Sequence, residues 1–357
     1  MTTSSKSQRR PEKASPENPP KKRKRLSNAL AENKFRAEEV GLWFTDGNII
    51  IVGGSTPFKV HRSVLFQRSS VLKDMFSLPS DESELMEGLP VEYLPESRSD
   101  LMYMLLGMYY GQKYLGHKKV VEFTMLSALL RLGTKYKITE LREEAVARLR
   151  VCFPRRLGSF INSLSMRNDA GFSCVPDVIA MGISDVLEVI NLARAHDIPD
   201  ILPPAFYICS TLSPVQMVPV KTWDDDPPTL LSPKDLRRLL RGKDSLIQED
   251  NDFMLLLRTE FRPNLKSCKQ LCHRRFNAAF NSNPESLPDA GTFLVQNFWV
   301  NEVLPDKDFC VDCIEDMVEE VNRHRREIWS NLGKTFDCGP WPLPDDVDLE
   351  EESDTQS

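Results

Sequence analysis

Residues 42–78 decide the fold of this chain, and they read LWFTDGNIIIVGGSTPFKVHRSVLFQRSSVLKDMFSL. A β-branched run from Ile49 to Val52 ends at Gly53-Gly54, and alternating residues resume from Phe58 to His61. Two such runs around a glycine-containing turn predict a β-hairpin. The apolar spacing then becomes helical on both sides of Ser69-Ser70, residue types that favour helix N-termini. The stretch therefore predicts a hairpin followed by two short helices.

Strand and helix signals continue to about residue 160. Residues 89–94 alternate as a strand, and Asp100 is placed to cap a helix that Tyr109-Tyr110-Gly111 would end. Two amphipathic helices are expected over residues 120–132 and 139–151. Together these signals predict an α+β domain in which a short sheet packs against a helical cluster.

This succession resembles a BTB/POZ domain, and we expect it to occupy residues 36–165. The resemblance rests on the entry from Trp43 to Asn48, the hairpin, the helix pair and the Tyr-Tyr-Gly sequence, and the entry is most similar to that of BTB proteins of filamentous fungi. The resemblance implies binding to other proteins, often as a homodimer formed through the first helices. It also implies that Asp46, His61 and Arg62 shape a pocket or brace the fold. A lone histidine at a strand end is more typical of a structural residue than of a catalytic base.

Some BTB proteins recruit a cullin scaffold for ubiquitin ligation, using a hydrophobic-x-Glu element after the second helix. Leu85-Met86-Glu87 stands at that place here, although a three-residue match is weakly specific. The chain shows no kelch repeat, MATH domain, ankyrin array or tandem zinc finger beside the BTB-like region. An adaptor role in a cullin-type ligase therefore remains an alternative to a general interaction role.

The second half of the chain predicts a mostly α-helical module over residues 177–344. A stretch rich in Asn, Asp, Gly and Ser near residues 166–176 marks its beginning. Helix starts are expected at a capping box from Asp185 to Glu188, at Pro203-Pro204 and at Ser232-Pro233. A long helix with a charged face is expected from Val311 to Leu332, with Trp329 and Trp341 packed near its end.

Composition and the polar first residues predict a protein that stays inside the cell. The chain has 357 residues, of which 41% are hydrophobic and 27% charged, so it has room for about two ordinary globular domains. It contains no apolar run long enough for a membrane span, and its first residues are polar and basic, unlike a secretory signal. We therefore expect no membrane association.

Charge is concentrated at the two ends. Residues 1–30 carry nine Lys or Arg and two Glu with few apolar residues, which predicts a disordered basic tail over residues 1–35. Residues 345–357 carry seven Asp or Glu and no base, which predicts a disordered acidic tail. The net charge of −6 argues against a broadly basic body that binds nucleic acid.

A cluster of five cations lies within the basic tail: Lys21, Lys22, Arg23, Lys24 and Arg25. It follows Pro19-Pro20 and resembles a nuclear-localisation signal, with Arg9-Arg10 at the spacing of a bipartite form. An exposed, extended run of cations suits the acidic sites of an import receptor. The same residues could instead form a solvated run or a nonspecific tether to nucleic acid. The prediction is a nuclear protein, present in the nucleus alone or in nucleus and cytoplasm.

Four of the eight cysteines form two close pairs. Cys268 and Cys272 have three residues between them, Cys310 and Cys313 have two, and 37 residues separate the pairs. Both spacings allow two thiolates to reach one ion, so the four are candidate ligands of a structural zinc, with His273 and Cys338 as substitutes. The alternatives are ordinary buried packing and a metal- or redox-dependent enzyme. The enzyme is disfavoured because no phosphate loop, nucleophile elbow or His-Glu-x-x-His motif is present.

Overall fold

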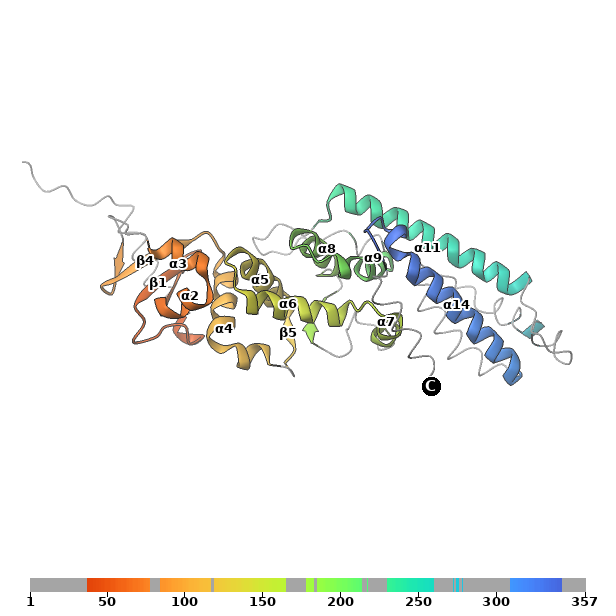
Figure 1. The fold of residues 1–357 in the computed structure, drawn as a ribbon, viewed down its shortest axis with the longest axis horizontal. Coiled ribbons are helices and arrows are strands. Elements are labelled where there is room, and N and C mark those ends of the chain that lie inside the picture. Colours follow the sequence, from red (N-terminus) through yellow and green to blue (C-terminus); the bar gives the residue numbers. More distant parts are fainter. Residues whose placement is uncertain are drawn as a thin grey trace, which may run out of the picture. The chain divides into compact units, whose positions relative to one another are not determined.

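The computed structural model describes residues 37–77, 84–116, 119–164, 178–182, 185–213, 217, 230–259, 272, 274, 275, 278 and 309–341 (Figure 1). They divide into two compact units, Met1–Leu105 and Leu106–Ser357. Among the described residues, no helix is both long and apolar enough to cross a membrane.

The first unit contains the predicted hairpin. Strand β1 (Ile49–Gly53) pairs antiparallel with β2 (Thr56–Val60), and Gly54 adopts a positive φ of 57° in the turn between them. Strand β4 (Leu89–Leu94) lies parallel to β1, and β3 (Leu85–Met86) pairs antiparallel with β4, giving the order β2-β1-β4-β3. The predicted strand at 89–94 is confirmed, and the sheet is short.

Two helices follow the hairpin, as predicted: α2 (Arg62–Arg68) and α3 (Ser70–Ser77). The Ser69 hydroxyl accepts a hydrogen bond of 3.0 Å from the Leu72 amide, so a serine does begin the second helix. The core of this unit consists of fully buried apolar side chains from the sheet and helices: Ile49, Ile51, Phe58, Val60, Leu65, Leu72, Leu101 and Leu105.

Helix α4 (Arg98–Leu115) corrects two details of the sequence prediction. The Ser97 hydroxyl accepts the Asp100 amide at 3.1 Å, so Ser97 caps the helix and Asp100 lies in its first turn. Tyr110 has φ −128° and ψ 32°, which interrupts the helical geometry, yet the helix continues to Leu115. The Tyr-Tyr-Gly sequence therefore marks a kink and not the end of the helix.

In the second unit, α5 (Phe123–Lys135) packs against α6 (Thr139–Cys152), confirming the two amphipathic helices. The first of them starts later than residue 120 because β5 (Val121–Glu122) pairs in parallel with β6 (Ile179–Ala180). This second small sheet was not predicted. The mostly helical character of the C-terminal region is confirmed.

Helices α7 (Leu157–Leu164), α8 (Asp185–Ala195) and α9 (Leu202–Ser210) follow, with a 3-10 turn (Pro199–Ile201) before α9. The capping box expected at Asp185 is wrong. The carboxylate of Asp185 accepts the Gly182 amide at 2.6 Å, and Glu188 accepts the Ser127 hydroxyl at 2.7 Å. Asp185 is itself the first residue of α8, and its amide donates to the Gly182 carbonyl at 3.2 Å, while Glu188 ties α8 to α5.

The last two long helices, α11 (Pro233–Thr259) and α14 (Val311–Thr335), run antiparallel side by side (Figure 1). Arg238 near the start of α11 binds Asp337 just after α14 at 3.0 Å, and Phe253 stacks on His324 with ring centroids 3.9 Å apart. The predicted packing of the tryptophans is confirmed, since the Trp341 indole donates to the Trp329 carbonyl at 2.8 Å.

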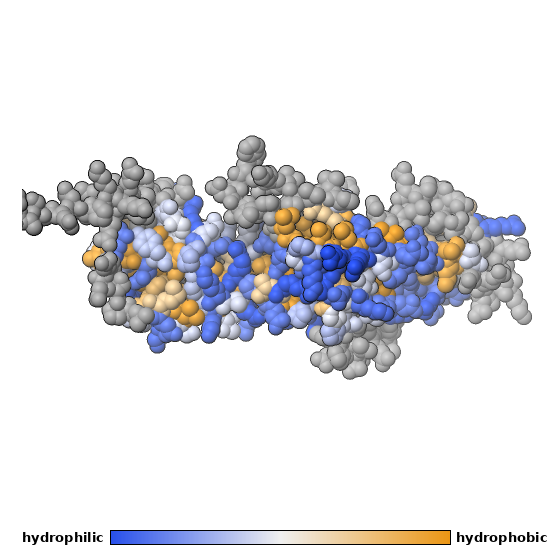
Figure 2. All heavy atoms as spheres, turned by 90° about the horizontal axis from the view of Figure 1, so that it is seen from above, coloured by the Kyte–Doolittle hydropathy of each residue, from blue (hydrophilic) through white to orange (hydrophobic). Residues whose placement is uncertain are grey.

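The surface mixes polar and apolar residues. On the face drawn in Figure 2, hydrophilic side chains surround separate apolar areas. Large hydrophobic side chains that stay exposed include Met75, Leu85, Tyr93, Leu236, Leu240 and Leu255. Apolar side chains on the surface of the described residues are therefore found in both units.

Candidate functional site

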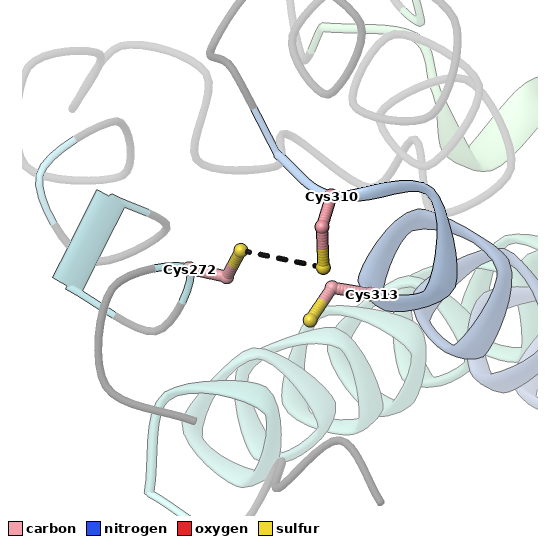
Figure 3. A group of neighbouring side chains, drawn as sticks. All are labelled: Cys272, Cys310 and Cys313. Carbon is pink, nitrogen blue, oxygen red and sulfur yellow. Dashed lines mark hydrogen bonds between the residues drawn. The ribbon is translucent and has the colours of Figure 1, made fainter. Parts of the chain in front are cut away.

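Three of the four candidate zinc ligands converge at the N-terminus of α14 (Figure 3). Cys310 is the N-cap residue of the helix, Cys313 lies in its first turn, and Cys272 comes from the chain before it. All three sulfur atoms lie within 4.8 Å of one another, and the Sγ atoms of Cys272 and Cys310 are 3.9 Å apart. The two-residue spacing at 310–313 thus places both thiols on one side of a helix start.

The sulfur geometry fits a tetrahedral metal. With Zn–S bonds of about 2.3 Å, tetrahedral geometry places neighbouring sulfurs about 3.8 Å apart. The Cys272–Cys310 separation of 3.9 Å is close to that value. A disulfide would instead require about 2.05 Å. The Cys272–Cys310 pair therefore lies at the spacing that a bound zinc would impose, and the third sulfur, of Cys313, lies within 4.8 Å of both.

The environment of the cluster is largely buried. Cys313 is 1% exposed and Cys272 is 4% exposed, while Cys310 is partly exposed. Burial raises the pKa of the Cys313 thiol, and its hydrogen bonds with Cys310 and Cys272 raise it further. The positive N-terminal end of α14 favours negative charge at the same place. A cation bound to the three sulfurs would balance the negative charge of their thiolate forms and so stabilise those forms.

The remaining candidate ligands have different outcomes. Cys268 and His273 lie outside the described residues. Cys338 is wrong as a substitute, because it follows the C-terminal end of α14, and a helix of 25 residues separates its ends by roughly 37 Å. Its thiol contacts the Phe336 carbonyl at 3.4 Å, and burial raises its pKa to about 12.

The polar residues flanking the hairpin brace the fold. The His61 Nε2 atom lies 3.1 Å from the Asp46 carboxylate, and its ring lies 4.9 Å from that of Phe44. The hydrogen bond from His61 lowers the pKa of Asp46. The Arg62 amide donates to the Asn48 side chain at 2.8 Å. These contacts link the entry loop to the start of α2 and favour the structural interpretation of His61.

The hydrophobic-x-Glu element forms the β3 edge strand and the turn after it. Leu85 is 66% exposed, whereas Glu87 adopts a positive φ of 53° and its carboxylate lies 3.4 Å from the Lys59 ammonium. Glu87 and Gly88 both have positive φ, as in the two-residue type I′ turns that join antiparallel strands. The element thus presents one apolar side chain to solvent, with its glutamate bound to β2.

Arg148 is a central residue that the sequence did not reveal. Its side chain is only 7% exposed, and its guanidinium donates to four backbone carbonyls, three of them between Leu115 and Lys119 and one at Val178. These are the carbonyls of Lys119 at 2.7 Å, Val178 at 2.9 Å, Leu115 at 2.8 Å and Gly116 at 3.3 Å. The only sequence signal was an arginine on an amphipathic helix, which is commonly a solvated position.

The nuclear-localisation residues Lys21 to Arg25 and the acidic tail from residue 345 lie outside the described residues.

Comparison with curated proteins finds no match to the chain. Residues 44–151 match the family described as BTB/POZ domain, and the match extends over both compact units. The small four-stranded sheet with its helical cluster agrees with that assignment. Residues 44–151 of this chain are therefore a BTB/POZ domain, a domain through which proteins bind other proteins.

Proposed function

We propose that this chain is a non-enzymatic interaction protein that self-associates through its BTB/POZ domain. The observation that carries the proposal is the BTB/POZ match over residues 44–151 together with the hairpin, sheet and helix succession. The proposal divides the chain into a basic tail (1–35), a BTB domain (36–165), a helical module (177–344) and an acidic tail (345–357). It also keeps the resemblance to fungal BTB proteins, which rests on the entry from Trp43 to Asn48.

The first helices support a homodimer. Met75 on α3 is 45% exposed although its side chain is apolar, and α2 and α3 are the elements that the BTB resemblance implies in dimer formation. Burial of such a side chain against a partner is favourable. A change to a charged residue there should weaken association without disturbing the core.

Sedimentation or light scattering of the full chain tests self-association. The wild type should be a dimer at micromolar concentration, and Met75→Asp should shift it toward monomer. Leu255→Asp is the matched control, because Leu255 is also apolar and is 58% exposed on α11. A monomeric wild type at those concentrations would reject the homodimer.

The proposal includes import into the nucleus by a receptor that binds Lys21 to Arg25. Replacement of all five residues by Ala should make a fluorescent fusion mainly cytoplasmic, because the cationic heads that dock on the receptor are lost. The control replaces Lys234, Arg237 and Arg241, which are exposed cations on α11. A variant whose distribution equals that of the wild type would contradict the signal.

A cullin scaffold is the alternative partner. The observation that favours it is the exposed Leu85 within the hydrophobic-x-Glu element. Purification of the tagged full chain from cells should then recover a cullin, and Leu85→Asp should abolish the recovery. If neither the wild type nor Leu85→Asp recovers a cullin but both recover other proteins, the ligase role is rejected and the general interaction role stands.

The cysteine cluster favours a further function, which is to hold a structural zinc through Cys268, Cys272, Cys310 and Cys313. Four cysteine ligands would close the site, whereas catalytic zinc keeps a position for water or substrate. The number of cysteine ligands therefore distinguishes a structural zinc site from the site of a metal-dependent or redox enzyme. Measurement of zinc content should show a loss for Cys268→Ser and none for His273→Ala. The reverse pattern would make His273 the fourth ligand.

A further inference from the structure

Helices α11 and α14 are joined by different contacts at one end and in the middle of the pair. At the end that contains the C-terminus of α14, Arg238 binds Asp337 at 3.0 Å. The same end brings Phe336 so close to Gly242 that a Cβ atom there would lie 2.2 Å from the ring. In the middle, Phe253 stacks on His324 at 3.9 Å. The cysteine cluster lies at the other end, at the start of α14.

The cysteine cluster lies far along α14 from the Phe253–His324 ring stack. Cys313 precedes His324 by three helical turns, which is roughly 16 Å at a rise of 1.5 Å per residue. The side chains of this stretch that face inward are apolar, namely Met317 and Val321, each 3% exposed. The ion pair of Arg238 with Asp337 and the Phe253–His324 ring stack lie at or beyond His324. The three sulfurs are thus placed where a directional link would join this helix to the preceding chain, in addition to the apolar packing of Met317 and Val321.

The donor set selects the type of ion. The group consists of three sulfur atoms and includes no described carboxylate or imidazole. Soft thiolates favour Zn²⁺ and similar thiophilic ions over Mg²⁺ and Ca²⁺, which require oxygen ligands. Ordinary packing explains two buried cysteines. It does not explain why the partly exposed Cys310 also directs its sulfur to the same point (Figure 3).

We infer that Cys272, Cys310 and Cys313 bind Zn²⁺ as a clamp that holds the N-terminal half of α14 in place. The inference rests on the proposed zinc site and adds its mechanical role. The ion joins residues that are 38 positions apart, so it closes a long loop and restricts the states in which the start of α14 separates from the preceding chain. Without the ion, the start of α14 loses this link, while the α11–α14 pair keeps the contacts at its other end and middle.

Metal binding is measured first, on the full chain. The protein is stripped with a chelator, and Co²⁺ is added as a spectroscopic substitute for Zn²⁺. Tetrahedral thiolate coordination should give thiolate-to-metal charge-transfer bands that saturate at one Co²⁺ per chain and disappear when Zn²⁺ is added. Cys313→Ser should weaken binding at least about 100-fold, since one strong ligand is lost. Cys338→Ser is the matched control and should bind as the wild type does.

Amide hydrogen exchange then tests the clamp. Addition of Zn²⁺ to the stripped wild type should slow exchange over residues 311–323, with no change in α5. This comparison uses the wild type alone, so it holds even where a cysteine variant fails to fold. Zinc binding with unchanged exchange over 311–323 overturns the clamp and leaves the zinc site intact. A lack of stoichiometric metal overturns both the clamp and the zinc site. So does a Cys272–Cys310 disulfide that persists under reducing conditions. The measurement of self-association through the BTB domain does not depend on these results.

Discussion

The guanidinium of Arg148 donates a hydrogen bond of 2.9 Å to the backbone carbonyl of Val178. Arg148 belongs to α6, within the region that matches the BTB/POZ family, while Val178 lies beyond it and directly precedes β6. The same guanidinium binds the carbonyl of Lys119, close to β5. One buried side chain thus fixes both strands of the β5–β6 pair. The chain after the BTB domain is therefore built into the same compact unit as its last helices.

Replacement of Arg148 by Met should destabilise the protein by about 2–4 kcal/mol. The variant keeps an apolar stem of similar length but removes the guanidinium donor from four carbonyls and the ion-pair partner from Glu144. The carbonyls of Gly116 and Val178 keep their backbone donors, whereas the other groups lose a hydrogen bond in a buried place, which is costly. Urea denaturation monitored by circular dichroism measures the change. The exposed Arg241 on α11 is the control, and Arg241→Met should shift the free energy of unfolding by less than about 0.5 kcal/mol. Equal effects for the two variants would contradict the role given to Arg148.

Core substitutions in the first unit should be costly. Leu65 and Leu105 are both 0% exposed, so Leu65→Ala or Leu105→Ala should lower the free energy of unfolding by about 2–5 kcal/mol. Leu85→Ala provides the control, because Leu85 is 66% exposed and loses little buried surface. Denaturation curves in which all three variants change by less than about 1 kcal/mol would show that Leu65 and Leu105 are not core residues.

The fold of the first unit could be predicted because its signals are local. The β-branched run at 49–52, the glycines after it and the change to helical spacing each act over a few residues. The end of α4 was predicted wrongly since Tyr110-Gly111 can either end a helix or kink it, and that choice depends on packing. Strand β6 was missed because Ile179–Ala180 has only two residues, too few to show a period, and its partner is 58 positions away.

Spacing predicted the cysteine cluster in part. Cys310 and Cys313 are close in sequence, so their convergence follows from helix geometry. The approach of Cys272 depends on how the chain returns after α11, which no local pattern indicates. Arg148 is a similar case, since its burial depends on carbonyls that are about 30 positions away on either side, those from Leu115 to Lys119 and that of Val178.

The stability of the protein should fall as the pH is lowered from about 6.5 to about 4, in part because of His324. The pKa of His324 is lowered from 6.5 to about 4, mainly by burial and also by the nearby Arg323, against an opposing effect of Glu320. The unfolded chain therefore binds a proton at His324 over a pH range in which the folded chain does not. This preference opposes folding progressively below pH 6.5, and the full difference of about 3 kcal/mol is reached below pH 4.

Unfolding free energies of the wild type and His324→Phe across that range isolate the contribution. Phenylalanine keeps the stacking on Phe253 but cannot be protonated, so its curve should fall less steeply between pH 6.5 and 4. Carboxylates elsewhere in the chain affect both proteins alike and cancel in the difference. Parallel curves would show that His324 is not protonated differently in the two states.

Two glycines in helices should respond in opposite ways to alanine. In α11, a Cβ at Gly242 would lie 2.2 Å from the Phe336 ring. That ring is fully buried and stacks on Phe206 with centroids 5.4 Å apart, so it cannot move aside easily. Gly242→Ala should therefore destabilise the protein by about 1–3 kcal/mol, more than the gain of up to about 1 kcal/mol in helix propensity.

Gly158 in α7 is the matched case, because nothing lies within 4 Å of the position that a Cβ atom would take there. Gly158→Ala should gain part of the helix propensity without a clash and raise the free energy of unfolding by a few tenths to about 1 kcal/mol. Thermal and urea denaturation of the two variants give the comparison directly. Because the residue change is identical, a difference in sign can come only from the surroundings. If Gly242→Ala were as stable as Gly158→Ala, α11 and the end of α14 could not pack as closely as the structure shows.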